Sequence, residues 1–191
     1  MLRHIGGSLT KSENVIKTLK ISGKKIIFRY PNADDVKELA ATINELVEEG
    51  AEIAKTTKVS VNEEKKWLMQ VMDAIKRKEK VMLLAEMDGK VIGGCEVSRD
   101  SFDVSRHVGT LGVGLQRESR GLGIGKLLIK STMAESKKKM GLRLIKLYVF
   151  STNKSGLQIY ERLGFQKAGR IRKGVYHNGT FKDDIIMTRS L

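Results

Sequence analysis

Hydrophobic and polar residues follow two different periods along the first half of the chain. Residues 24–30 (KKIIFRY) form a short run rich in isoleucine and aromatic side chains, which predicts a β-strand. Over residues 36–47 apolar side chains recur every three or four positions, and they do so again over residues 62–75. This spacing places them on one face of a helix, so two amphipathic helices are expected. Residues 1–23 show only weak periodicity, which predicts an N-terminal extension with a short helix at residues 15–19.

The second half of the chain contains mainly the short apolar runs that are typical of strands. We expect strands at 81–87, 91–97 and 107–116, a helix at 123–139, a strand at 144–150, a helix at 155–163 and two final strands. Asp88-Gly89 and Asn178-Gly179 supply two-residue turns for a hairpin near each end of this series. The complete order, β-α-α-β-β-β-α-β-α-β-β, predicts one α/β (α+β) domain with a mixed sheet at residues 24–191.

Composition places the chain among ordinary globular proteins. Of its 191 residues, 40% are hydrophobic, 30% are charged and one is proline, which excludes disorder as the dominant state. No stretch approaches the roughly 18 uninterrupted apolar residues that a membrane span requires, and the N-terminal segment lacks the pattern of a signal peptide. The single cysteine, Cys95, excludes an intramolecular disulfide and a cysteine-rich zinc site. We therefore expect a cytoplasmic protein without a membrane partner or a metal.

Charge is distributed unevenly along the chain, whose formal net charge is +14. Residues 104–182 contain seventeen Lys and Arg but only three acids, whereas residues 33–54 contain seven acids and one Lys. A basic half indicates an anionic partner such as a nucleic acid, a membrane surface or a phosphate-rich cofactor. The alternative is a lysine-rich surface that only keeps the protein soluble.

The segment 116–126 (QRESRGLGIGK) joins an expected strand to an expected helix and contains three glycines within five residues. Glycines let the chain turn tightly, and the free N–H groups of the helix start favour a phosphate there. A Walker loop is excluded because Leu127 stands where Ser or Thr would bind the metal. A dinucleotide fingerprint is excluded because it follows the first strand of its unit and needs an acid about 20 residues later, where this chain has lysines.

Two motifs resemble those of the GNAT superfamily of N-acetyltransferases. Arg120-x-x-Gly123-x-Gly125 is similar to the family's R/Q-x-x-G-x-G/A signature, and Asn153 followed by residues 159–165 (IYERLGF) is similar to its N…lYeklGF segment. The resemblance extends from about Lys24 to the C-terminus. It implies a GNAT fold and the direct transfer of acetyl from acetyl-CoA to a primary amine on a polyamine, a small molecule or a protein N-terminus.

The resemblance also assigns roles to individual residues. The implied acetyl-CoA-binding residues are Val113, Gly114, Leu115, Arg120, Gly121, Leu122, Gly123, Ile124, Gly125, Lys126, Asn153 and Tyr160. Among these, the N–H of Leu115 at the family's bulge position would polarise the thioester carbonyl. Tyr160 would be the general acid that protonates the departing thiolate, although a core tyrosine is the alternative. Asn153 would contact the cofactor, although it would also serve as a simple helix cap.

The general base and the acceptor site are less well defined. One branch of the family has a glutamate where this chain has Tyr148, and other members have a carboxylate in the strand that here contains Thr110. The remaining candidates are Glu96, Asp183 and Asp184, although Asp184 more often anchors a final strand. In the family the first helix and the loop after it form one wall of the acceptor site. That wall includes Glu48 and Glu49 here, which predicts a cationic acceptor.

A second function class competes with the enzyme, namely a basic RNA- or ribosome-associated protein that retains the fold without catalysis. Nucleic-acid binding favours aromatic residues interleaved with the bases, and only 5% of this chain is aromatic. An intact glycine-rich turn and Tyr160 favour the enzyme. Nucleic acid is therefore not expected as a partner, and a homodimer is an open alternative.

Overall fold

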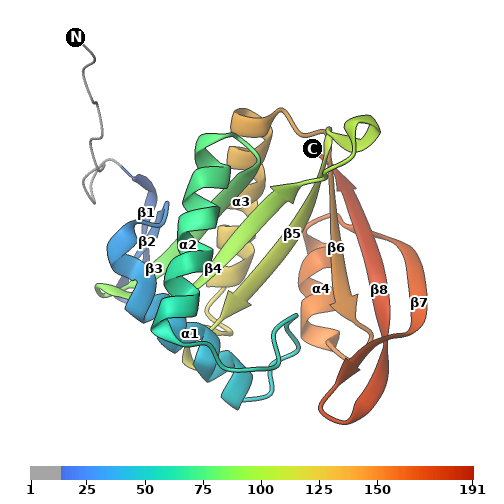
Figure 1. The fold of residues 1–191 in the computed structure, drawn as a ribbon, viewed down its shortest axis with the longest axis horizontal. Helices are drawn as coiled ribbons and strands as arrows, with labels where there is room; N and C mark the ends of the chain where they lie inside the picture. Colours follow the sequence, from blue (N-terminus) through green and yellow to red (C-terminus); the bar gives the residue numbers. More distant parts are fainter. Residues whose placement is uncertain (1–13) are drawn as a thin grey trace.

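A computed structural model describes residues 14–191, which form one mixed sheet with helices on both faces (Figure 1). The strands are β1 (Val15–Ile21), β2 (Lys24–Arg29), β3 (Lys80–Met87), β4 (Lys90–Arg99), β5 (Val108–Leu115), β6 (Leu144–Phe150), β7 (Gln166–His177) and β8 (Thr180–Ser190). The helices are α1 (Val36–Glu48), α2 (Val61–Lys76), α3 (Ile124–Met140) and α4 (Lys154–Arg162). The strand order in the sheet is β1-β2-β3-β4-β5-β6-β8-β7. From β2 onward, the predicted order of elements is confirmed.

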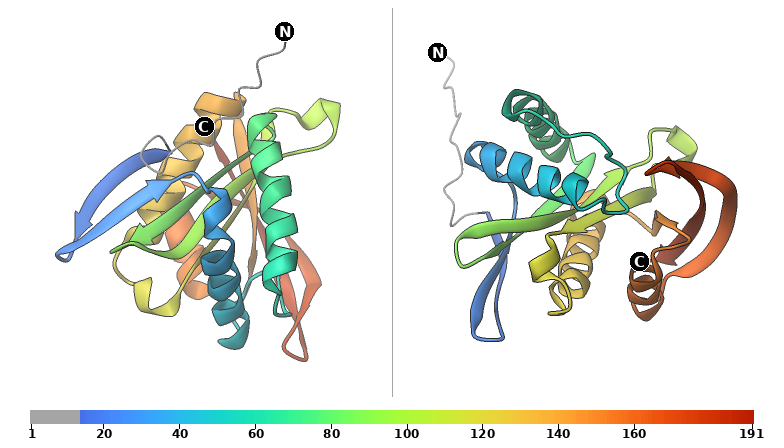
Figure 2. Two further views of the ribbon diagram at one scale, coloured as in Figure 1. Left: turned by 60° about the vertical axis from the view of Figure 1, so that its left-hand side comes forward. Right: turned by 90° about the horizontal axis from the view of Figure 1, so that it is seen from below.

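Two layers of helices cover the sheet, as the view from below in Figure 2 shows. Helices α1 and α2 lie on one face, where Leu39, Leu68 and Leu84 belong to one buried cluster. Helices α3 and α4 lie on the other face, over a larger buried cluster that includes Leu128 and Ile145. Among residues 14–191, no helix combines the length and the apolar character needed to cross a membrane.

The strand β1 corrects the prediction for the start of the chain. The short helix expected at residues 15–19 is wrong, because Val15–Ile21 pairs with β2 in antiparallel fashion. Ser22 and Gly23 join the two strands with φ of 50° and 81°, the left-handed values that a two-residue hairpin turn requires. The sheet therefore extends back to Val15, while the predicted domain boundary at residue 23 stays a prediction. The first part of the predicted extension, residues 1–13, lies outside the described residues.

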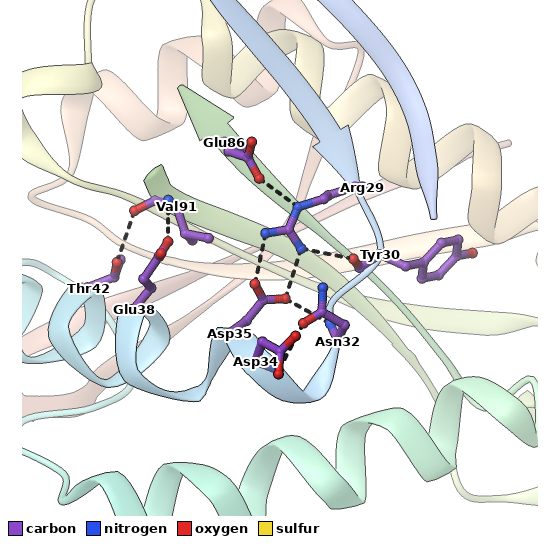
Figure 3. Close-up of polar contacts among 9 residues, drawn as sticks. All are labelled: Arg29, Tyr30, Asn32, Asp34, Asp35, Glu38, Thr42, Glu86 and Val91. Atoms are coloured by element: carbon purple, nitrogen blue, oxygen red, sulfur yellow. Dashed lines mark hydrogen bonds and ion pairs between the residues drawn. The ribbon is translucent and has the colours of Figure 1, made fainter. Parts of the chain in front are cut away.

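A buried ion-pair network holds the start of α1 against the sheet (Figure 3). The Arg29 guanidinium donates to both carboxylate oxygens of Asp35 at 2.8 Å, and its Nε donates to Glu86 at 2.8 Å. Further along α1, the Glu38 carboxylate accepts from the N–H of Val91 at 2.8 Å. Removing one partner of such a network would leave an uncompensated buried charge, so these contacts fix the position of the start of α1 relative to the sheet. Its C-terminal end leads directly into the loop that lines the cleft described next.

Candidate active site

The strands β5 and β6 separate in the middle of the sheet. The two strands pair in parallel over only four residue pairs. The first pair is Val108 of β5 with Leu144 of β6, and the last is Leu111 with Leu147. Beyond that point β5 stays paired with β4 as far as Leu115, and β6 stays paired with β8 as far as Phe150. The chain therefore has a notch between residues 112–115 of β5 and residues 148–150 of β6.

Backbone groups of β5 face this notch. The N–H of Gln116 donates to the Ile92 carbonyl at 2.9 Å, and successive residues of a strand point their polar groups to opposite sides. The N–H and C=O groups of Val113 and Leu115 therefore point away from β4 and toward the notch. In agreement, the Leu115 carbonyl accepts from Arg120 Nε at 2.9 Å. Val113 and the N–H of Leu115 thus offer a strand edge to a ligand.

The bulge expected at Leu115 is wrong. The strands β4 and β5 pair in an unbroken register from Gly93 with Leu115 to Arg99 with Gly109. The irregularity lies on the other side of β4, where its pairing with β3 shifts next to Gly93. Gly93 has φ of +147°, and a Cβ there would lie 2.2 Å from the Gly114 carbonyl oxygen. Only glycine allows β4 to approach the end of β5 so closely, and the irregularity lies in β4 while β5 stays regular.

The glycine-rich turn lies directly beyond the notch. Gly121 and Gly123 have φ of 77° and 78°, which side chains rarely adopt, and Gly123 is the N-cap of α3. A Cβ on either glycine would meet no atom within 4 Å, so open space lies against the backbone. The first N–H groups of a helix lack partners within it, and no acidic residue stands in the first turn of α3. This helix start combines a positive dipole end with room for a phosphate.

The notch opens into a cleft of about 360 Å³. Its lining comes from the α1–α2 loop, the end of β5, the glycine-rich turn and the start of α4, and includes Ala51, Ile53, Val113, Leu115, Arg120 and Asn153. Five of the twelve sequence-predicted ligands line this cleft, namely Val113, Gly114, Leu115, Arg120 and Asn153. Lys126 is exposed and lies in the first turn of α3.

The two predicted acceptor residues have partners within the protein. The Glu49 carboxylate accepts from Arg117 Nε at 3.0 Å and also pairs with Arg120. Although burial acts in the opposite direction, the hydrogen bonds from both arginines lower the pKa of Glu49 below its usual value. Glu48 pairs with Lys58 on the surface. Glu49 therefore fastens the end of α1 to the glycine-rich turn, and the acceptor role of both residues stays a prediction.

Tyr160 lies on α4, on the α3 face of the sheet. Its ring packs edge-on against Phe165, with 5.8 Å between ring centroids, and it contacts the larger buried cluster. Burial raises the pKa of Tyr160 well above its usual value, and the nearby Cys95 contributes to the same effect. The phenol therefore keeps its proton at neutral pH, and in acid–base chemistry it serves as a proton donor and not as a base. Burial also raises the pKa of Cys95 to about 12, which argues against a thiolate nucleophile there.

Comparison with known proteins agrees with this geometry. Residues 43–165 match the model of the acetyltransferase (GNAT) family. The chain belongs to the GNAT family of acetyltransferases. It is therefore an N-acetyltransferase, as the sequence motifs predicted, and the fold and family predictions are confirmed.

Three relatives illustrate how far this GNAT chain resembles known members. The SPbeta prophage-derived N-acetyltransferase YokL of Bacillus subtilis is 28% identical over 134 residues, 68% of this chain and 72% of YokL. The L-amino acid N-acetyltransferase AaaT of Escherichia coli is 24% identical over 56% of this chain and 66% of AaaT. The structure of yncA from Salmonella typhimurium with its cofactor acetyl-CoA superimposes with a TM-score of 0.77, 20% identity, and coverage of 87% of this chain and 94% of yncA.

Asn153 has a structural role that the geometry defines clearly. Its Oδ1 accepts from the N–H of Gly156 at 2.9 Å, which caps the start of α4, and its side chain also lines the cleft. We expect Asn153→Ala to lower the free energy of unfolding by about 1 kcal/mol, because the cap is lost. Asn153→Asp should retain the cap and the melting temperature while adding negative charge to the cleft.

The two variants separate the capping role of Asn153 from its role in binding. Thermal unfolding of the free protein measures the cap, and the stabilisation produced by acetyl-CoA measures binding. If Asn153→Asp binds acetyl-CoA as tightly as the wild type, the residue is only a cap.

The candidate general bases differ in what surrounds them. Glu96 accepts from Lys80 Nζ at 2.6 Å. Asp183 accepts from Arg170 Nε at 2.5 Å and from the N–H of Lys173 at 2.7 Å. Asp184 is buried, and its Oδ1 has neither solvent contact nor a hydrogen-bond partner. Tyr148 lies half exposed on β6 and Thr110 on β5, but neither is a carboxylate.

Proposed function

We propose that this GNAT enzyme binds acetyl-CoA along the notch and transfers the acetyl group directly to a primary amine. The observation that carries the proposal is the separation of β5 and β6, which frees the backbone of Val113 and the N–H of Leu115 beside a helix start suited to phosphate. An extended pantetheine arm fits this edge as an added strand would. The pyrophosphate fits the amides of residues 121–126, with Arg120 and Lys126 as the nearby cations.

The chain's own residues then account for the chemical step. The N–H of Leu115 donates to the thioester carbonyl and stabilises the oxyanion that forms when the amine attacks. Tyr160 holds a proton at neutral pH and gives it to the departing thiolate. Tyr160 lies on the α3 face, so the amine approaches from the opposite face, that of α1 and α2. Acid and amine on opposite sides of the thioester suit direct transfer in a ternary complex.

The proposed acceptor class is a primary amine, namely a polyamine, a small amine such as an amino acid, or a protein N-terminus. AaaT acts on L-amino acids by its name, which supports including them. The arginine and lysine partners of Glu49 and Glu48 weaken the case for an acidic wall that selects cationic acceptors.

The proposal is tested by following the thiol released from acetyl-CoA with a panel of amines. The panel consists of spermidine, single L-amino acids, an aminoglycoside and a basic peptide with an N-terminal alanine. We expect turnover with at least one of them, at a rate that depends on its concentration. Tight binding of acetyl-CoA without turnover on any amine would instead favour the non-catalytic binding protein.

A further inference from the structure

We propose that Asp184 is the group that receives the ammonium of the acceptor and removes its proton, which makes it the general base of this enzyme. The inference rests on the proposed function, because it assumes a primary amine as the acceptor. It identifies a catalytic residue on β8. This strand pairs with β6 on the side of β6 that is opposite to the notch.

The first observation is the state of the Asp184 side chain. Only 8% of the residue is exposed, and the buried Oδ1 atom has no hydrogen-bond partner among the described residues. A buried carboxylate without a partner costs free energy, which a fold tolerates where a ligand supplies the missing partner. An ammonium group provides up to three N–H donors and the opposite charge, so it pairs with a buried carboxylate better than a neutral ligand does.

The second observation is the face of the sheet on which Asp184 lies. Ile185 and Met187 of β8 belong to the buried cluster on the α3 face. Side chains alternate along a strand, so Asp184 and Ile186 point to the face of α1 and α2. Tyr160 lies on the α3 face, on the other side of the notch. The proposed acid and the proposed base are therefore on opposite faces, an arrangement that suits direct transfer.

The third observation is the position of Asp184 relative to β6 and the α1–α2 loop. Asp184 is the pairing partner of Phe150, the last residue of β6, where β6 borders the notch. Tyr148 pairs with Ile186, which makes Asp184 its diagonal neighbour at a Cα separation of about 7–8 Å. The α1–α2 loop lies over the same face, because the His177 ring nitrogen contacts the Ala51 carbonyl at 3.0 Å. Asp184 thus lies under the loop that lines the cleft.

Six other carboxylates in this part of the protein already have side-chain partners. Glu45 pairs with Gln116, Glu48 with Lys58, Glu49 with Arg117 and Arg120, Glu52 with Lys182, Glu96 with Lys80, and Asp183 with Arg170. A carboxylate held by Arg or Lys is a weaker base, because the cation stabilises its charged form. Among the described residues, Asp184 is the carboxylate with a buried oxygen that has no hydrogen-bond partner.

The surroundings of Asp184 make its carboxylate a stronger base than that of a solvated aspartate. Burial raises the pKa of Asp184 above its usual value, which makes the carboxylate a stronger base. The titratable and charged groups that face it from neighbouring elements are Lys182, His177, Tyr148, Lys146 and Glu52. Lys182 is engaged by Glu52 at 2.8 Å and Lys146 by Asp100 at 2.7 Å, so both cations have anionic partners of their own.

The proposed step balances as follows for an ammonium acceptor. Asp184 takes one proton from the ammonium, and the nitrogen lone pair forms the C–N bond to the thioester carbon. The C–S bond breaks, and the thiolate takes the proton of Tyr160. The second nitrogen proton leaves with formation of the amide and returns to the Tyr160 phenolate through solvent. Asp184 then releases its proton to solvent, so one proton is released overall.

The experiment compares Asp184→Asn with Asp183→Asn, which changes the neighbouring carboxylate that Arg170 already holds. The acceptor is the panel amine with the highest kcat/KM in the wild type. We expect Asp184→Asn to lower kcat/KM for the amine about 100-fold, with KM for acetyl-CoA unchanged. In the wild type, kcat/KM should fall on the acidic side with an apparent pKa above the ordinary Asp value of about 3.9, and this fall should disappear in Asp184→Asn. Asp183→Asn should stay within about threefold of the wild type.

Thermal unfolding supplies a second readout that does not depend on the acceptor. The folded-state pKa of Asp184 is raised, so its charge destabilises the fold at pH 7, and this penalty vanishes as pH falls below the unfolded-state pKa. Asp184→Asn should therefore melt higher than the wild type at pH 7, with the difference closing toward pH 4. A lower melting temperature at pH 7 would show that the charged side chain stabilises the fold, which contradicts the unpaired carboxylate on which the inference rests.

The outcomes distinguish this inference from the proposed function. If the wild type acetylates no amine of the panel, the proposed function fails and the inference fails with it. If the wild type acetylates an amine and Asp184→Asn matches its rate and pH profile, the inference alone fails.

Discussion

Replacing Tyr160 with Phe should slow acetyl transfer by about 10²–10³-fold, because the departing thiolate loses its proton donor. The phenyl ring should keep the packing against Phe165, so the protein should remain folded. Acetyl-CoA should still stabilise the variant, because the cleft and the glycine-rich turn are unchanged. The measurement is kcat at saturating acetyl-CoA, together with the melting temperature with and without it.

Tyr176→Phe is the matched control for this prediction. Tyr176 lies 62% exposed near the tip of the β7–β8 hairpin, and it packs against Phe181. Removing the hydroxyl of Tyr176 should leave kcat within about twofold of the wild-type value. Because burial raises the pKa of Tyr160, the wild-type rate should show no alkaline fall below about pH 10. Full activity of Tyr160→Phe would show that the thiolate takes its proton from elsewhere.

Gly123→Val should abolish the stabilisation of the protein by acetyl-CoA. The branched side chain would project into the open space at the start of α3, where the pyrophosphate is proposed to bind. At a ligand concentration of about 100 Kd, binding to the wild type should add about 2.7 kcal/mol to the free energy of unfolding. For a domain of this size that corresponds to a shift in melting temperature of about 5–10 °C.

Gly141→Val controls for backbone strain at the other end of the same helix. Gly141 is the C-cap of α3, with φ of 65° and no atom within 4 Å of an added Cβ. Both variants should lose about 1–3 kcal/mol of stability from the left-handed backbone conformation. Only Gly123→Val should also lose the shift produced by acetyl-CoA. A full shift in Gly123→Val would exclude the glycine-rich turn as the phosphate site.

The sequence predicted most elements of the fold, because their signals are local. The helices α1 and α2 show a clear three- and four-residue period, and two-residue turns mark the hairpins at Asp88-Gly89 and Asn178-Gly179. The strand β1 was missed because it is an edge strand that is exposed over most of its length, so it shows little alternation. Ser22-Gly23 was the signal that could have identified its hairpin with β2.

The candidate site was predictable only where it depends on a contiguous segment. The glycine-rich turn lies within residues 120–126, so its spacing alone indicates a phosphate site. The bond between Glu49 and Arg120 joins residues 71 positions apart, and no local pattern indicates which charges meet. Asp184 stands out among the described carboxylates only in the tertiary structure, which buries its Oδ1 completely and leaves that atom without a hydrogen-bond partner.

Amide hydrogen exchange with and without saturating acetyl-CoA tests the central claim most directly, because it locates the cofactor on the backbone. The notch predicts added protection at Val113, Leu115 and residues 121–126, with little change in β1 or β7. Protection that is absent from these amides and concentrated elsewhere would contradict the proposal that the gap between β5 and β6 is the acetyl-CoA site.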